Sequence, residues 1–495
     1  MLHRTRLTLA ILMAWATSSL VPAAYAQRTA AAPRISGTDT NCPRNALLSS
    51  TRASNSLSVP EMPQRPRPLK LAQLDYPVPP TASAAELLQA ADDYAVYADW
   101  VNYRAYLQQV VSSHPGSKDA GLALGLLADE YASIGDTGRA EACAAQLASY
   151  ADAEVQAFAA LCRTAFPAQR ARQNDVYETT LVSYAAQWKG TASGGRAALA
   201  LADYYRFTTL DYPRALTTYQ GVLTDCAGAL VGEEAQVSLA EALDWSVPSQ
   251  PEGSRAAFEA ALSTVHYPGL QVRCVLGLAD LMSKSMCVDQ ALDSLTQLIA
   301  TYPSHPAVTH AYALRSIAAE RVGNWDLAVS DARAFLAKAV VGSFNLARCH
   351  TVLAKDAYRK GNLDEAAAQF TTTAQLAEAD NHTSETADLG GPAQAGLAAI
   401  AQDRGDLRGA MQCLLKGADL VSCPRLKDTY LFQAADLAAQ LHDDAARAQI
   451  IARMTSELPG SGLTTKLVYC TEDTFTSRRV ASHSDCRAKG SAASN

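Results

Sequence analysis

Apolar residues recur at steps of three and four along most of the chain from Ser83 onward. Stretches such as ELLQAADDYAVYADW, GLALGLLADEYASI and CVLGLADLMSK have this spacing, and the alternation of strands is missing from them. Short polar breaks separate successive stretches, as at Gly135-Asp136 and Gly361-Asn362. The pattern predicts an all-α protein built from pairs of amphipathic helices.

Two of the breaks are nearly the same, because RVGNWDLAVSDA at 321–332 is followed 38 residues later by RKGNLDEAAAQF. An alanine stands five residues after each turn glycine, at Ala140, Ala328, Ala366 and Ala410. Where the glycine is replaced, we assign the same place to Ala105, Ala215, Ala291 and Ala446. A period near 34 predicts stacked helical hairpins. The glycine would adopt a left-handed turn, the following Asp or Asn would cap the second helix, and the alanine would let the helices approach.

A phosphate-binding loop is the competing interpretation of a Gly-Asn pair beside a basic residue. That loop needs G-x-x-x-x-G-K-[ST] between a strand and a helix, and this sequence has neither part. The turn between two helices is therefore the preferred interpretation.

These positions resemble the tetratricopeptide repeat family. The best unit has Leu353-Ala354 and Ala357 in its first helix, then Gly361, Ala366 and Phe370. Similar units begin at Leu127-Ala128 and Leu278-Ala279. The resemblance implies a right-handed α-solenoid over residues 83–462, in which the first helices line a groove that holds extended peptides or partner helices.

Both ends of the chain differ from the repeats. Residues 1–26 combine a basic start, the apolar run LTLAILMAWA and Ala24-Tyr25-Ala26, which predicts a cleavable, bacterial-type signal peptide. Residues 27–82 contain nine of the 21 prolines and predict a disordered linker. Residues 463–495 are rich in Ser, Thr and Arg, and we expect a loose tail. We therefore expect export to a bacterial periplasm or to the extracellular space.

Charge and hydropathy exclude two classes of partner. Removal of Arg4 and Arg6 with the signal leaves 40 basic and 49 acidic residues, a net charge of −9, without the clustered basic residues that nucleic acids require. No stretch approaches the roughly 18 apolar residues of a membrane span. The expected partner is another exported or envelope protein or peptide, and self-association through the terminal repeats is an alternative.

Basic residues recur near the ends of successive predicted first helices. If the first helices line a groove, as the resemblance implies, these residues form a basic stripe able to hold a carboxylate or an acidic segment. The candidate groove residues are Lys284, Arg321, Lys355, Tyr358 and Arg359. In the alternative interpretation, the basic side chains are solvated or paired with neighbours such as Asp280 and Glu320.

The sequence has eleven cysteines, an odd number, and no C-x-x-C pair. The candidate disulfides are Cys470–Cys486, which would close a loop in the tail, and Cys143–Cys162, which would join adjacent helices. Cys274 and Cys349 recur at one repeat position, which favours buried packing roles.

Catalytic and metal-binding motifs are missing from the sequence. It contains no HExxH, GxSxG or GxGxxG, and its histidines are scattered. Acidic pairs such as Asp129-Glu130 are expected on helix surfaces. We therefore expect no catalytic residue, metal or cofactor, and interpret the chain as a non-enzymatic protein-binding scaffold. The alternative is a helical-repeat enzyme, or an enzyme's targeting domain, acting on cell-wall or polysaccharide material.

Overall fold

The structure is a computed structural model that describes residues 81–97, 99–246, 249–285, 287–339, 345–379, 389–421 and 423–463. The predicted signal peptide, residues 27–80 of the predicted linker, the Cys470–Cys486 pair and the tail beyond Leu463 lie outside the described residues.

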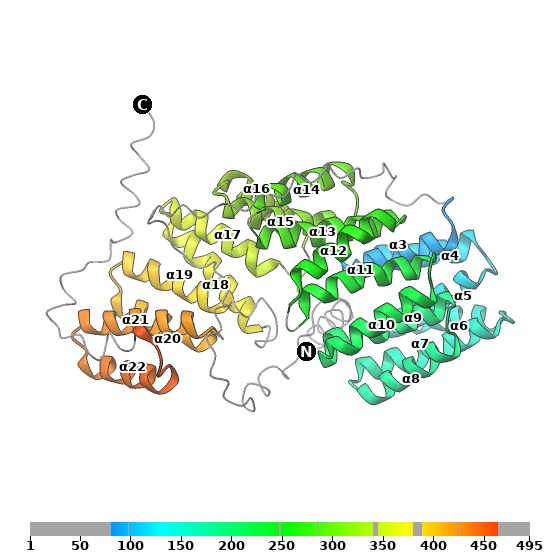
Figure 1. The fold of residues 1–495 in the computed structure, drawn as a ribbon, viewed down its shortest axis with the longest axis horizontal. Helices are drawn as coiled ribbons and strands as arrows, with labels where there is room; N and C mark the ends of the chain where they lie inside the picture. Colours follow the sequence, from blue (N-terminus) through cyan, green and yellow to red (C-terminus); the bar gives the residue numbers. More distant parts are fainter. Residues whose placement is uncertain are drawn as a thin grey trace. The chain divides into compact units, whose positions relative to one another are not determined.

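All regular structure in the described residues is helical, and consecutive helices pack in pairs (Figure 1). This confirms the predicted all-α solenoid of helical hairpins. The chain divides into two compact units, Met1–Asp356 and Ala357–Asn495, and the boundary falls within α17 (Leu346–Arg359).

The first unit contains seven hairpins among its described residues. Their first helices are α3 (Ala84–Val96), α5 (Lys118–Ser133), α7 (Ala153–Arg170), α9 (Ala192–Asp203), α11 (Leu230–Trp245), α13 (Pro268–Lys284) and α15 (Ala307–Arg321). Their second helices are α4 (Trp100–Ser113), α6 (Thr137–Leu147), α8 (Asn174–Gln187), α10 (Tyr212–Asp225), α12 (Pro251–Thr264), α14 (Val288–Thr301) and α16 (Trp325–Leu336). A six-residue π-helix, η1 (Tyr204–Thr209), continues α9.

The described helices of the second unit, after the end of α17, repeat the same arrangement. They are α18 (Leu363–Ala379), α19 (Gly390–Asp403), α20 (Leu407–Leu420), α21 (Pro424–Gln440) and α22 (Asp444–Glu457).

The hairpin turns have the conformation that the sequence predicts. At Gly135 the φ angle is +81°, and the amide of Asp136 donates to the carbonyl of Tyr131 at 2.9 Å. The carboxylate of Asp136 then accepts from the amide of Arg139 at 3.1 Å, which caps α6. Gly323, Gly361 and Gly405 have the same positive φ, each followed by a capping Asn or Asp. The turn interpretation is confirmed.

The alanine after the turn is completely buried in five hairpins and half-buried at Ala140. Ala215, Ala291, Ala328, Ala366 and Ala410 are all completely buried. Each lies four residues after the residue that caps or precedes its helix.

Ala105 is a wrong assignment, because it lies on the exposed side of α4. The helix is capped by Asp99, so the buried position four residues later is Tyr103. Ala446 is likewise displaced by one residue, because Asp443 caps α22 and Ala446 follows it by three. The size of the residue at this position therefore varies more than the repeat pattern suggests.

Candidate partner-binding surface

The predicted basic stripe forms a ladder of contacts between neighbouring hairpins. Lys284, at the end of α13, has its Nζ 3.2 Å from Asp244 of α11 and 2.7 Å from Asp280 of its own helix. Lys355 lies 3.0 Å from Glu320 of α15. The guanidinium of Arg321 donates to the carbonyl of Ser283 in α13. These contacts match the alternative interpretation, in which the basic side chains pair with neighbours.

Tyr358 and Arg359 lie at the end of α17, in the second unit. Arg359 is exposed, Tyr358 is half-buried, and both side chains take part in interactions. The role of the five candidate residues in holding a partner stays a prediction.

Cys143 and Cys162 are free thiols in the structure, so the predicted bond between α6 and α7 is not formed there. The buried Cys162 packs against Gly125 of α5, whereas the half-buried Cys143 lines a pocket. Cys274 and Cys349 are completely buried, as their repeat position predicts.

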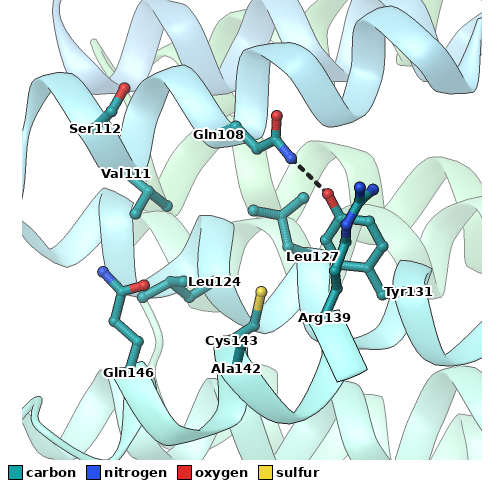
Figure 2. A pocket seen from close by; sticks show the side chains of 10 residues that line it. All are labelled: Gln108, Val111, Ser112, Leu124, Leu127, Tyr131, Arg139, Ala142, Cys143 and Gln146. Carbon is teal, nitrogen blue, oxygen red and sulfur yellow. Dashed lines mark hydrogen bonds between the residues drawn. The ribbon is translucent and has the colours of Figure 1, made fainter. Parts of the chain in front are cut away.

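The pocket beside Cys143 has a volume of about 230 Å³ and lies between α4, α5 and α6 (Figure 2). Gln108 donates to the hydroxyl of Tyr131 at 2.5 Å, and the guanidinium carbon of Arg139 lies 5.5 Å from the centre of that ring. Burial raises the pKa of the Cys143 thiol, so the thiol is protonated at neutral pH and is a weak nucleophile. The pocket can hold a small apolar group, but its residues do not form a catalytic arrangement.

A more extensive arrangement surrounds α3, the first helix in the described part of the first unit. Asp92 forms an ion pair with Arg196 of α9, and the Nε2 of Gln89 lies 3.4 Å from Glu234 of α11. Figure 1 shows α3 beside α11, in agreement with the contacts between the two helices. α3 therefore touches the fourth and fifth hairpins of its unit as well as its own.

The neighbouring carboxyl group, Asp93, is only 1% exposed and reaches two further hairpins. Tyr267, which precedes α13, donates its hydroxyl to Asp93 at 2.9 Å. The Nε2 of His305, before α15, lies 3.9 Å from the same carboxyl. Burial raises the pKa of Asp93 well above its usual range and lowers the pKa of His305 to about 3.

The end of α3 makes an aromatic contact with α15. The ring of Tyr97 lies 5.4 Å from the ring of His310, at an angle of 77°. Burial lowers the pKa of His310 to about 4, so this histidine is neutral at pH 7 and packs as an aromatic ring. We call Arg196, Glu234, Tyr267, His305 and His310 the α3-contact surface.

Arg273 of α13 holds the acidic side chains behind this surface. Its guanidinium lies 3.0 Å from Glu241 and 3.6 Å from Glu234, and it donates to Ser238 at 3.3 Å. Arg206 of η1 also binds Glu241, at 3.1 Å. Burial alone would raise the pKa of Glu241, but the two guanidinium groups outweigh it and lower that pKa.

A second carboxyl group with a raised pKa, the half-buried Asp203, lies where α9 gives way to η1. The hydroxyl of Tyr219 donates to Asp203, and burial raises the pKa of Asp203 to about 7. The widened π-turn places Arg206 beside Glu241, with its guanidinium carbon 4.4 Å from the centre of the Phe207 ring.

The α3-contact surface was not predicted from the sequence. Its only local signal is a set of charged residues on otherwise apolar first helices, such as Asp92-Asp93 in ELLQAADDYAVY and Arg273 in QVRCVLGLA. Their partners lie 32 to 174 residues away along the chain, which a repeat pattern does not reveal.

The described residues contain no group of three or more His, Cys, Asp or Glu side chains suited to a metal ion. In the described part of the chain, none of the helices has the length and apolar character needed to cross a bilayer.

Comparisons with known proteins give matches in structure only. No protein-family model matches the sequence, and no curated protein matches it. The structure is similar to a tetratricopeptide repeat protein from Parabacteroides merdae, with 14% identity, a TM-score of 0.36, and coverage of 55% of this chain and 97% of that one.

Two further solved structures are also similar to this chain. The human IFIT1 dimer with PPP-AAAA has 12% identity, a TM-score of 0.43 and coverage of 76% and 95% of the two chains. Rap protein complexed with competence and sporulation factor has 14% identity, a TM-score of 0.40 and coverage of 71% and 99%. At this similarity, no ligand or partner is transferred to this chain.

Proposed function

We propose that this tetratricopeptide-like α-solenoid is an exported, non-enzymatic scaffold that binds another exported or envelope protein or peptide. The observation that carries the proposal is the packing of α3 across the first helices of distant hairpins. A surface that holds one amphipathic helix by apolar contacts, an ion pair and hydrogen bonds has the chemistry of a helix-binding groove.

The expectation of export comes from the signal-like pattern of residues 1–26. Secretion of a full-length fusion, with and without these residues, tests it directly. We expect the mature form to begin near Gln27 and to appear outside the cytoplasm, and retention of the full-length fusion inside the cell would contradict it.

The basic residues Lys284 and Lys355, with their acidic neighbours, are a second element of the proposed partner site; we call them the basic ladder. Lys284 is 36% exposed and Lys355 is 47% exposed, so their ammonium groups remain accessible while they pair with acidic neighbours. An acidic segment of a partner would exchange with those neighbours at little energetic cost, because exposed ion pairs contribute only about 0–1 kcal/mol.

The test is a crosslinking pull-down of the mature chain from its native envelope fraction, with two matched variants. Lys284→Glu/Lys355→Glu removes the positive charges, whereas Asp244→Lys/Glu320→Lys breaks the same ladder and keeps them. We expect the wild type and the second variant to capture one specific protein, and the first variant to lose it.

Equal capture by both variants would remove the ladder from the proposal and leave the scaffold in place. Failure of the wild type to capture any specific protein would overturn the scaffold itself.

A further inference from the structure

α3 makes contacts that differ in range from those of the other first helices in its unit. First helices such as α9, α11 and α13 contact the next first helix along the chain. α3 contacts α5 in the same way, and it also contacts α11. Its ion pair with Arg196 spans 104 residues, and its hydrogen bond from Tyr267 spans 174.

One face of α3 carries all of these distant contacts. Gln89, Asp92, Asp93 and Tyr97 follow one another at steps of three, one and four residues, which places them on the same side of a helix. The remaining buried positions are apolar apart from the hydroxyl group of a tyrosine: Ala84, Leu87, Leu88, Ala90, Ala91 and Tyr94. α3 therefore has the residue pattern of a helical ligand, with a polar recognition face between apolar flanks.

The fit of α3 to its surface is incomplete. The Oε1 of Gln89 is buried without a hydrogen-bond partner among the described residues. Asp93 is a carboxyl group in a desolvated position, where the charged form is disfavoured. A helix with better-matched groups at these two positions would bind the same surface more favourably.

Resting on the scaffold function proposed above, we propose that the α3-contact surface is the partner site, and that α3 occupies it as an exchangeable internal ligand. The partner is a helical segment with an acidic residue opposite Arg196, an amide or hydroxyl side chain near Tyr267 and an aromatic residue opposite His310. The partner binds by displacing α3, so α3 covers the α3-contact surface when no partner is bound.

The experiment uses the full chain and a fluorescent peptide of residues 84–97 as the probe, with binding followed by anisotropy. In the wild type the internal α3 competes, and we expect weak binding. Asp92→Arg places two positive charges together at Arg196 and releases α3. We therefore expect this variant to bind the wild-type peptide at least tenfold more tightly.

A charge swap assigns the effect to this contact. Arg196→Asp also releases α3, and it should bind a peptide carrying Asp92→Arg in preference to the wild-type peptide. In the double variant Asp92→Arg/Arg196→Asp, α3 should return to its surface, and the peptide should bind as weakly as it does to the wild type. Lys189→Asp is the matched control, because it breaks an ion pair with Asp225 that does not involve α3.

Hydrogen exchange of residues 84–97 and circular dichroism accompany each titration. Exchange that stays slow in Asp92→Arg would identify α3 as a permanent part of the core and overturn the proposal. Fast exchange, retained helicity and no peptide binding would overturn it as well. If Asp92→Arg loses helicity, Arg196→Gln provides the milder release, and absence of peptide binding there has the same consequence.

The same variants separate this inference from the scaffold function. If the wild type captures a specific partner and Asp92→Arg does not increase the capture, the scaffold function is supported. The proposal that the α3-contact surface is the partner site is then contradicted. If Asp92→Arg binds the peptide more tightly while no partner is captured, the exchange of α3 is supported and the scaffold function is contradicted.

Discussion

The two compact units use the same hairpin but bury different side chains. In the first unit, Asp93, Arg206, Arg273 and Asp331 are all less than 10% exposed. In the described part of the second unit, the only buried polar side chains are those of Thr373 and Gln394. The repeat sets the backbone of both units, whereas contacts between distant hairpins decide which charges lose contact with water.

The first unit keeps its buried charges by pairing them. Arg273 binds two carboxylates and Arg206 shares one of them, so burial leaves few isolated charges. Such pairs contribute little net stability but are costly to break, because a lone buried charge remains. The comparison therefore predicts that charge substitutions act strongly in the first unit and weakly in the second.

The largest expected effect comes from Arg273→Met. Glu234 and Glu241 would lose a shared buried cation, and the free energy of unfolding should fall by about 3–5 kcal/mol. The control is Arg453→Met in the second unit, where pairs with Asp419 and Glu457 are partly exposed and the loss should be about 0–1 kcal/mol. Chemical denaturation measures both, and equal losses would contradict the comparison.

A bulky side chain at a completely buried alanine should be destabilising in either unit. Ala366 of α18 is completely buried, so Ala366→Trp should destabilise the second unit by about 1–3 kcal/mol or more through overpacking. Ala368→Trp, two residues later on the exposed side of the helix, is the control and should change little. An unchanged melting temperature in Ala366→Trp would show that the repeat register is wrong.

The pH dependence of Asp203 tests burial in the first unit. Its pKa rises from the usual value near 4 to about 7 on folding, so the unfolded chain releases this proton at lower pH than the folded chain. Stability is therefore lost as the pH rises from about 4 to about 7.

Asp203→Asn keeps an acceptor for Tyr219 and removes this titration. We expect the variant to gain about 1 kcal/mol or more at pH 7 and almost nothing at pH 4. Asp364→Asn, at an exposed position in the second unit, is the control and should change stability by less than about 0.5 kcal/mol at both pH values. A gain in Asp203→Asn that is equal at both pH values would rule out the titration.

The smallest expected effect concerns a turn that both units share. Gly135→Ala and Gly405→Ala place a side chain at φ near +81°, and each should lose about 1 kcal/mol. Gly138→Ala, inside α6 with open space around it, should instead gain about 0.5–1 kcal/mol. Different losses at the two turn glycines would show that the hairpins of the two units are not equivalent.

Local chemistry explains why the hairpins could be predicted from the sequence. A glycine in a left-handed turn, the Asp or Asn that caps the next helix and the small residue four positions later all act within a few residues. The register failed at Ala105, where Asp99 rather than a glycine marks the start of the helix and a tyrosine fills the buried position. Leu210 adopts the left-handed turn at φ 55° without being glycine, because η1 shifts the end of the first helix.

The α3-contact surface was beyond prediction for a different reason. Asp92 and Asp93 have the composition of a solvated helix face, and only the return of distant hairpins toward α3 buries them. The basic residues at the ends of α13, α15 and α17 were recognised, but the acidic neighbours that bind Lys284 and Lys355 come from preceding hairpins. Pairing across repeats depends on the packing of whole helices.

The contacts of α3 with distant hairpins can form only late in synthesis of the chain. Tyr267 leaves the ribosome 174 residues after Asp93. At about 5–20 residues per second, this corresponds to a delay of roughly 10–35 s. During that time α3 can pack against α4 and α5, whereas its contact with Tyr267 cannot form.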